Sequence, residues 1–366
     1  MQNVATMKGP FDGLLEAWPR KLILLAIVVV VVAFPAMATE LNASRYTTAV
    51  VFAVIGLSVN ILMGYAGQIS LGHQAFVGVG AFSAAYLATN TGLPIYLAIP
   101  LAGVIGGAIS AILGLVALRI QGLYLALITL AYGAVAERSI FSIQALTGGG
   151  AGIPALRPEP FVKDNTYSYF CLLVLMLVLF FDWRMMRTKF GRALLALKSN
   201  EQVAASFGMN PVFYKVGAFV VAGIVAGIGG GLYAFKEQHV VSADFTFALA
   251  LTFVIMTVIG GLGNRIGVVL GSAFTAYIPV ILNSVARWFD AQWVIPYRLL
   301  FTALLLLLTL TQFPGGIAQQ LHPFTEWLVG KPFHLPHKKK GKGKKHKGKA
   351  ATTVDIADES DPEEQH

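Results

Sequence analysis

Apolar stretches separated by short polar connections run through most of this chain. About ten stretches are long enough to cross a bilayer as helices, since a spanning helix needs about 20 mostly apolar residues. Their approximate bounds are Leu22–Ala38, Thr47–Met63, Phe76–Thr89, Pro94–Leu118, Leu123–Gln144, Tyr167–Phe181, Val216–Phe235, Phe247–Leu262, Ile266–Asn283 and Tyr297–Gln312. The pattern predicts an all-α, polytopic bundle of about ten transmembrane helices.

Composition and charge placement support a membrane setting. The chain is 56% hydrophobic and 12% charged, whereas about a quarter of the residues of a soluble domain are charged. Basic residues are retained on the cytoplasmic side of short connections. With ten spans, one side receives Lys8, Arg20, Lys21, Arg119, Arg184, Arg187, Lys189, Arg192, Lys198, Arg265 and the Lys-rich tail, and the other receives Arg157, Lys163, Arg287 and Arg298. This bias predicts that both termini are cytoplasmic.

The pattern divides the chain into three regions. Residues 1–21 are expected to be a cytoplasmic N-terminal segment, and 22–316 the membrane domain, whose first apolar stretch is expected to remain as a span and not to be cleaved as a signal peptide. In the tail, 317–366, the string HKKKGKGKKHKGK precedes the acidic TTVDIADESDPEEQH. We expect the tail to be disordered. Because the Lys run lacks interleaved aromatic residues, anionic lipid headgroups are favoured over nucleic acid as its partner.

Catalytic motifs are scarce. The sequence contains no GxxxxGK[ST] phosphate loop, no HExxH and no GxSxG, and its glycine-rich strings at Gly148 and Gly260 are not expected between a strand and a helix. The single cysteine, Cys171, leaves no intrachain disulfide and no metal-binding cluster. We therefore expect a protein that is not an enzyme, binds no metal or cofactor and does not itself hydrolyse ATP.

A polar, glycine-containing segment, GYAGQISLGHQAF, interrupts the apolar pattern between Gly64 and Phe76. Irregular polar backbone at membrane depth is tolerated only where it is buried in protein or lines a cavity. A break here would present backbone dipoles and amide side chains to a polar solute. The candidate pathway residues are Gly64, Gly67, Gln68, Ser70, Gly72, His73 and Gln74. The alternatives are an ordinary cytoplasmic turn and, for His73, a packing or capping role.

A basic loop at about 183–215 separates the sixth and seventh stretches. It predicts two short helices, Gly191–Leu197 and Glu201–Phe207, with Gly208 and the following Asn-Pro ending the second. A short helix flanked by cations can fit a groove on a partner and steer it electrostatically. The alternative is a solvated connecting loop.

Small residues recur at four-residue spacing in two later stretches. The first set is Gly223, Gly227 and Gly231, and the second is Gly263, Gly267 and Gly271, with Gly260 and Gly261 just before it. Such stripes allow close helix approach. They are interpreted as helix-packing glycines and not as solute contacts.

Several of these segments together resemble a known family. The strings GYAGQISLGHQAFVGVGAF, GRALLALKSNEQVAASFGMN, YKVGAFVVAGIVAGIGGGLYA, VIGGLGNRIGVVLGSAF and FPGG occur in the order found in M-type permease subunits of bacterial branched-chain amino acid ABC importers. The resemblance covers most of the chain from Tyr46 to Gly316, and the basic and acidic tail lies outside it. It implies the ABC importer permease fold.

The resemblance also implies a role for the basic loop. In this family it is the EAA-type coupling loop, which docks on the ATP-binding subunit. Its matching positions here are Gly191, Arg192, Glu201, Ala204, Ala205 and Gly208. This sequence departs from the strict EAA triplet because Gln202 and Val203 separate Glu201 from the alanines.

The implied partners are a homologous second permease, two ATP-binding subunits that hold ATP and Mg²⁺, and a periplasmic binding protein that delivers leucine, isoleucine or valine. The implied location is the bacterial inner membrane. Permeases for urea, short amides, other amino acids or sugars remain alternatives, as does a membrane scaffold without solute flux. An ion-coupled secondary transporter would need a buried charge, and Glu137 is its only obvious candidate, although Glu137 and Arg138 are interpreted as an interfacial pair.

Overall fold

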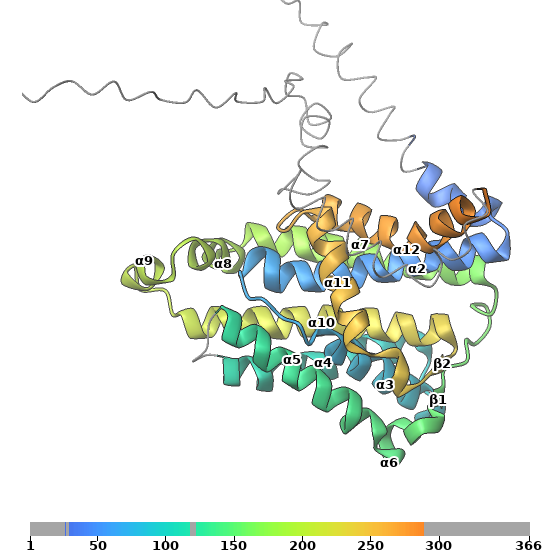
Figure 1. Cartoon of the computed structure of the whole chain (residues 1–366), viewed down its shortest axis with the longest axis horizontal. Coiled ribbons are helices and arrows are strands. Elements are labelled where there is room, and N and C mark those ends of the chain that lie inside the picture. The colour runs from blue at the N-terminus through green and yellow to red at the C-terminus, as the bar shows by residue number, and fades with distance from the viewer. Residues whose placement is uncertain (1–25, 27–28, 118–121, 289–366) are drawn as a thin grey trace, which may run out of the picture.

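The computed structural model describes residues 26, 29–117 and 122–288, and they form a helical bundle (Figure 1). The elements are α2 (Glu40–Val59), η1 (Asn60–Tyr65), α3 (His73–Thr91), α4 (Ile95–Ala117), α5 (Leu123–Arg138), η2 (Ile140–Ser142), α6 (Gln144–Thr147), η3 (Gly149–Ala151), β1 (Ile153–Pro154), α7 (Asp164–Arg187), α8 (Lys189–Ser199), α9 (Glu201–Ser206), α10 (Pro211–Glu237), β2 (His239–Val240), η4 (Ser242–Asp244), α11 (Phe247–Gly260) and α12 (Arg265–Trp288). The all-α prediction is confirmed, apart from the antiparallel pair of two-residue strands β1 and β2.

Each predicted apolar stretch between Thr47 and Asn283 has a helix at its position. In the described part of the chain, five helical segments are long and apolar enough to cross a membrane: Glu40–Tyr65, Ile95–Val116, Leu123–Ser142, Asp164–Arg187 and Pro211–Glu237. The helix α11 has only 14 residues, which is short for a full crossing. Of the predicted first stretch, Leu22–Ala38, residues 29–37 are helical, and the predicted last stretch, Tyr297–Gln312, lies outside the described residues.

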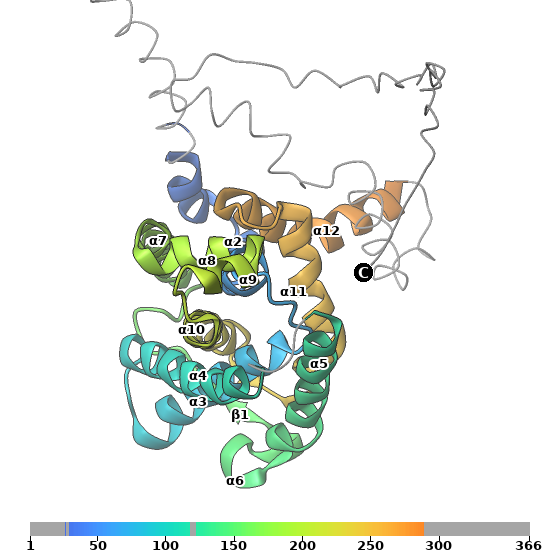
Figure 2. The same cartoon turned by 90° about the vertical axis from the view of Figure 1, so that its left-hand side faces the viewer.

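The helix α10 runs through the middle of the bundle. It lies between a layer containing α2, α7 and α12 and a layer containing α3 and α4, while α5 lies to one side next to α11 (Figures 1 and 2). Residues on every side of α10 are buried, as expected for a helix enclosed by others.

Small residues let α4 approach α10 closely. A Cβ atom on Gly227 would lie 2.6 Å from the Ala102 carbonyl oxygen, and one on Gly231 would lie 3.1 Å from a side-chain carbon of Ile99. Gly223 faces the same helix, where a Cβ would lie 2.7 Å from the Gly106 carbonyl oxygen. A larger side chain at Gly223 or Gly227 would push the two backbones apart, whereas at Gly231 it would first displace side chains.

The second glycine set divides between two roles. Gly260 and Gly271 pack together across α11 and α12, since a Cβ on Gly271 would lie 2.7 Å from the Gly260 Cα, and Gly267 faces Gly260 in the same seam. Gly261 and Gly263 instead lie in the turn between these helices, with φ of 106° and 87°. The interpretation of these two as helix-packing residues was wrong, because their positive φ angles serve the turn.

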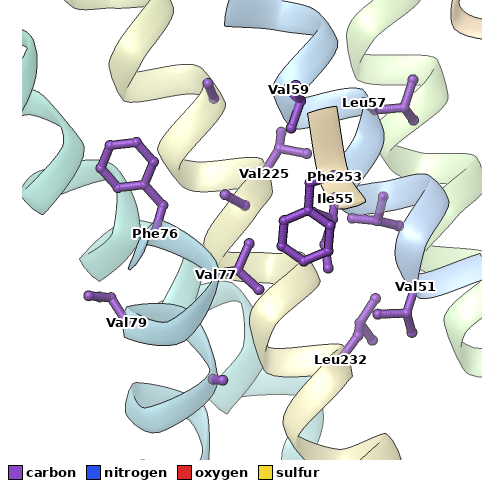
Figure 3. Packing of buried hydrophobic residues seen from close by; sticks show 14 of the residues in the cluster. Val51, Ile55, Leu57, Val59, Phe76, Val77, Val79, Val225, Leu232 and Phe253 are labelled. Atoms are coloured by element: carbon purple, nitrogen blue, oxygen red, sulfur yellow. The ribbon is translucent and has the colours of Figure 1, made fainter. Parts of the chain in front are cut away.

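The core lies where α2, α3, α10 and α11 meet. Ile55 of α2, Val77 of α3, Val225 of α10 and Phe253 of α11 point toward one another there (Figure 3) and are fully or almost fully buried. In a membrane, lipid tails are as apolar as these side chains, so their close van der Waals contacts, more than escape from water, stabilise the bundle.

Candidate functional site

The chain breaks its helical path between α2 and α3. The π-helix η1 extends α2 to Tyr65, residues 66–72 are not helical, and α3 begins at His73. This connection returns from the end of α2 into the middle of the bundle, where α3 starts (Figure 1). The predicted interruption is therefore present at interior depth. A π-helix within an α-helix frequently marks a functional position.

The polar side chains of this segment are buried. Gln68, Ser70, His73 and Gln74 are each at most 9% exposed, whereas Ile69 between them is 43% exposed. An ordinary solvent-exposed turn would place its polar side chains outward. The arrangement here is the reverse, so the segment is built into the protein.

The helices α2 and α5 enclose this segment from two sides. On α2, the Ser58 hydroxyl lies 2.5 Å from His73 Nε2. On α5, the Thr129 hydroxyl accepts a hydrogen bond of 3.0 Å from the Leu71 backbone N–H. Gly133, one turn further along α5, lies against the Gln74 amide, where any Cβ would collide with it.

Two polar contacts fix the π-helix η1 to the bundle. Near its start, the Asn60 side-chain oxygen accepts a hydrogen bond of 2.7 Å from the backbone N–H of Gly263, in the turn between α11 and α12. At its end, the Tyr65 hydroxyl donates to Asp182 of α7 over 3.1 Å, and Arg265 Nε donates to the same carboxylate oxygen over 2.7 Å. These bonds tie η1, α7 and the α11–α12 turn together.

A third contact joins η1 to the predicted coupling loop. The Lys198 ammonium, from the last turn of α8, donates a hydrogen bond of 2.6 Å to the Gly64 carbonyl oxygen. The aliphatic stem of Lys198 packs beside Gly67, where a Cβ would lie 3.0 Å from Lys198 Cγ. A displacement of α8 would therefore act directly on the chain entering the polar segment.

The loop itself forms two short helices, as predicted. The Asn200 side chain accepts from the Val203 N–H and caps α9, and Asn210 caps α10 by accepting from Val212 and Phe213. Between them, Gly208 adopts φ of +80°, a conformation that favours glycine. Helices α8 and α9 project from one end of the bundle, opposite β1 and β2 (Figure 1).

The predicted docking residues differ in what they contact. Gly191 packs on the end of α7, where a Cβ would lie 2.5 Å from Met186 Cα, and Ala204 is buried, whereas Arg192 and Ala205 are exposed. Both carboxylate oxygens of Glu201 lie 2.7 Å from the Lys215 ammonium near the start of α10. Glu201 thus holds α9 against α10.

Large apolar side chains are exposed among the polar residues of α8 and α9. Phe207 is 80% exposed, and Val203 and Leu195 are also exposed, with Arg192 on the same segment. These side chains lie outside the apolar body of the bundle, so they are suited to a protein partner. The sequence interpretation did not single out Phe207 or Val203. The sequence signal that could have identified them is the presence of apolar residues within a polar loop whose helices have capping residues.

A family model described as the branched-chain amino acid transport system permease component matches residues 43–310. The match includes both the polar segment and the loop that contains α8 and α9. The chain belongs to this family. In this permease, Lys198 of α8 is therefore in hydrogen-bond contact with Gly64, at the end of η1 that leads into the polar break.

Curated relatives agree with this assignment. The permease is 29% identical to the high-affinity branched-chain amino acid transport system permease protein LivM of Salmonella typhimurium, over 83% of this chain and 76% of that protein, and equally to LivM of Escherichia coli with the same coverage. It is 26% identical to a probable LivM of Methanocaldococcus jannaschii, over 63% of this chain and 78% of that protein. Among solved structures, PsaBC from Streptococcus pneumoniae in complex with Fab covers 82% of this chain at 18% identity, with a TM-score of 0.41.

Residues that the sequence interpretation did not select complete the site of the permease. Asn60, Tyr65 and Asp182 were treated as parts of apolar or loop segments, and Lys198 and Arg265 only as markers of orientation. An aspartate within an apolar helix was the available signal for Asp182, because an unpaired charge there is costly. The sequence separation of Asp182 and Arg265 does not reveal that the two residues form an ion pair.

Proposed function

We propose that this protein is the membrane-spanning subunit of an ATP-driven importer of branched-chain amino acids. The family match and the LivM relatives support the transport class. The single structural observation that supports an ATP-driven mechanism is the hydrogen bond from Lys198, in the coupling loop, to Gly64, at the start of the polar segment. It provides a route by which a partner's movement reaches the interior of the bundle.

The energy source lies in partner subunits. Two ATP-binding subunits, which hold ATP and Mg²⁺, dock on α8 and α9 through Phe207, Val203 and Arg192. A homologous second permease completes the membrane part, and a periplasmic binding protein delivers the solute at the opposite end. ATP binding and hydrolysis move the coupling loop and switch the bundle between two openings. This arrangement places both termini and the α8–α9 end in the cytoplasm of a bacterial cell.

The segment from Gly64 to Gln74 lines the solute path. A leucine, isoleucine or valine zwitterion needs hydrogen-bond partners for its carboxylate and ammonium groups and an apolar wall for its side chain. Buried Gln68, Ser70, His73 and Gln74 among apolar helices offer that combination. The pathway residues therefore act by hydrogen bonding and not by chemistry on the solute.

The proposal is tested by purifying the chain from its native membrane, identifying the subunits that accompany it, and reconstituting the complex in vesicles. Radiolabelled leucine uptake should require both ATP on the coupling-loop side and the binding protein on the other side. Uptake that follows an ion gradient without ATP would contradict it.

Another small solute is the second candidate. The autoinducer 2 import system permease protein LsrC of Shigella flexneri is 29% identical over 154 residues, 40% of this chain. This partial likeness shows that related sequence occurs in permeases named for a different cargo. An ion-coupled mechanism has less support, because the buried Asp182 carboxylate is paired with Arg265 and Glu137 lies at the end of α5.

A further inference from the structure

Buried polar groups without a hydrogen-bond partner gather where α3 begins. Among the described residues these include Ser70 Oγ, His73 Nδ1, both amide atoms of Gln74 and the Tyr132 hydroxyl. Ser70, His73 and Gln74 lie within five positions of one another in the chain. The Phe76 ring joins Tyr132 to them, since it lies 5.6 Å from His73 and 5.7 Å from Tyr132 between ring centroids. An unpaired buried polar group costs about 1–3 kcal/mol, and few are found in native proteins. Such a concentration indicates a binding site.

The N-terminus of α3 lies beside the same groups. The first N–H groups of a helix have no partner within it, and no side chain of the described residues caps α3 at Gly72. Gly72 packs against α5, as a Cβ on Gly133 would lie 3.1 Å from the Gly72 Cα. The Ala75 N–H donates to the Gly72 carbonyl oxygen over 3.1 Å. The remaining N–H groups of the first turn and the helix dipole together favour an anionic group at this end of the helix.

The cluster also contains acceptors for a cation. The Ser58 hydroxyl donates to the Ile55 carbonyl oxygen over 2.7 Å, so it can only accept from His73 Nε2. In the neutral imidazole ring this leaves His73 Nδ1 as an acceptor. Gln74 Oε1 is a second acceptor. Donors at the helix end and acceptors beside it match the two charged groups of an amino acid.

The lack of fixed charge favours a solute with no net charge. The cluster contains no Asp, Glu, Lys or Arg. The ion pairs of the described residues with a largely buried member, which are Asp182 with Arg265, Glu201 with Lys215 and Arg157 with Asp164, involve none of its residues. Burying an uncompensated net charge is costly. A zwitterion carries no net charge and needs only oriented dipoles.

One wall of the cluster is lightly packed. Only 28% of the α5 span is buried, compared with 83% of the α2 and η1 span. Contacts of α5 with the cluster include the Thr129 hydroxyl on Leu71, the Gly133 backbone beside Gln74 and the Tyr132 ring beside Phe76. Separating α5 from α3 would therefore disturb less packing than separating α2 from α3.

We propose that the N-terminus of α3, with Ser70 and Gln74, binds the carboxylate of the transported amino acid, and that α5 moves away from α3 to admit it. His73 Nδ1 and Gln74 Oε1 receive the ammonium group. This site rests on the proposed function and gives that function a specific recognition step.

The test uses the assembled complex in vesicles with Gln74→Leu and Gly133→Ala. The first removes the amide, and the second forces the amide aside because its new methyl group would occupy the amide's position. Gly150→Ala is the matched control, since a Cβ there meets no atom within 4 Å. Both test variants should lower maximal leucine uptake by about tenfold or more, with unchanged recovery of ATP-binding subunits, while the control keeps wild-type uptake.

Photoleucine, a diazirine analogue of leucine, locates the site in the wild-type complex. Labelling should fall on α3 or α5 and be prevented by leucine but not by isoamylamine, which has the same side chain without the carboxylate. Labelling only elsewhere, or equal competition by isoamylamine, would overturn the site. If both variants take up leucine as well as the wild type does, the site is overturned and the proposed function stands. If the wild-type complex shows no ATP-driven leucine uptake, both the site and the proposed function are overturned.

Discussion

The Lys198 ammonium donates a hydrogen bond of 2.6 Å to the carbonyl oxygen of Gly64, a residue 134 positions earlier in the chain. Lys198 belongs to the segment that projects from one end of the bundle, and Gly64 to the π-helix that leads into the buried polar segment. The bond makes one structural unit of two parts that the sequence separates widely. The bond supports the proposal that movement of the docked partner is transmitted to the solute path.

Lys198→Met should uncouple the two processes. Methionine keeps an unbranched apolar stem but removes the donor, so α8 can move without Gly64. We expect leucine transported per ATP hydrolysed to fall about fivefold or more, from loss of a charge-assisted hydrogen bond, with unchanged amounts of assembled complex. The matched control is Lys189→Met, at the exposed start of the same helix. A normal transport ratio in Lys198→Met would show that this bond transmits nothing.

Glu201→Arg should abolish uptake while the chain still inserts into the membrane. The new guanidinium would lie against the buried Lys215 ammonium, in place of a carboxylate 2.7 Å away, and repulsion would displace α9 from α10. Because the effect is electrostatic, the charge-exchanged double variant Glu201→Arg with Lys215→Glu should recover much of the uptake. Equal loss in the single and double variants would instead assign Glu201 a direct contact with the partner.

Phe207→Glu should weaken docking of the ATP-binding subunits. The side chain is 80% exposed, so the substitution changes the free energy of unfolding of the permease by less than about 0.5 kcal/mol. Loss of an apolar anchor at an interface typically costs about 2 kcal/mol of binding free energy. The affinity for the ATP-binding subunits should therefore fall roughly 30-fold, and less of these subunits should co-purify with the permease. Leu156→Glu, an exposed apolar residue near β1, is the control and should leave this affinity unchanged.

Arg265→Met should destabilise the permease more than the double variant Arg265→Met with Asp182→Asn. The single variant leaves the fully buried Asp182 carboxylate without its cation, which typically costs about 3–5 kcal/mol. The double variant removes the charge as well and keeps a polar group for the Tyr65 hydroxyl. Thermal unfolding of the purified complex measures the difference, and equal losses in the two variants would argue against a structural ion pair.

The positions of helices were predictable because they follow local hydrophobic pattern. The start of α11 at Phe247, the two short helices α8 and α9 and a break between α2 and α3 were all expected from apolar runs, caps and glycines. The break was expected to reach Phe76, whereas α3 begins at His73. Tyr297–Gln312 and the tail stay predictions, since they lie outside the described residues. The total of ten spans is likewise not established by the described helices.

The contacts within the site were not predictable from spacing. Asp182 and Arg265 are 83 positions apart, and Asn60 and Gly263 are 203 apart, so only the packing of the bundle reveals these pairs. The misassignment of Gly261 and Gly263 has a related cause. Gly263 continues the four-residue spacing of α12 and Gly261 directly follows Gly260 of α11, and sequence position alone does not show which glycines have a positive φ.

The most direct test of the account is leucine uptake by the complex in vesicles with the coupling-loop side accessible to ATP. The account predicts leucine accumulation that requires ATP and the binding protein and persists when ion gradients are collapsed. Accumulation driven by an ion gradient in the purified chain alone, without ATP-binding subunits, would contradict it.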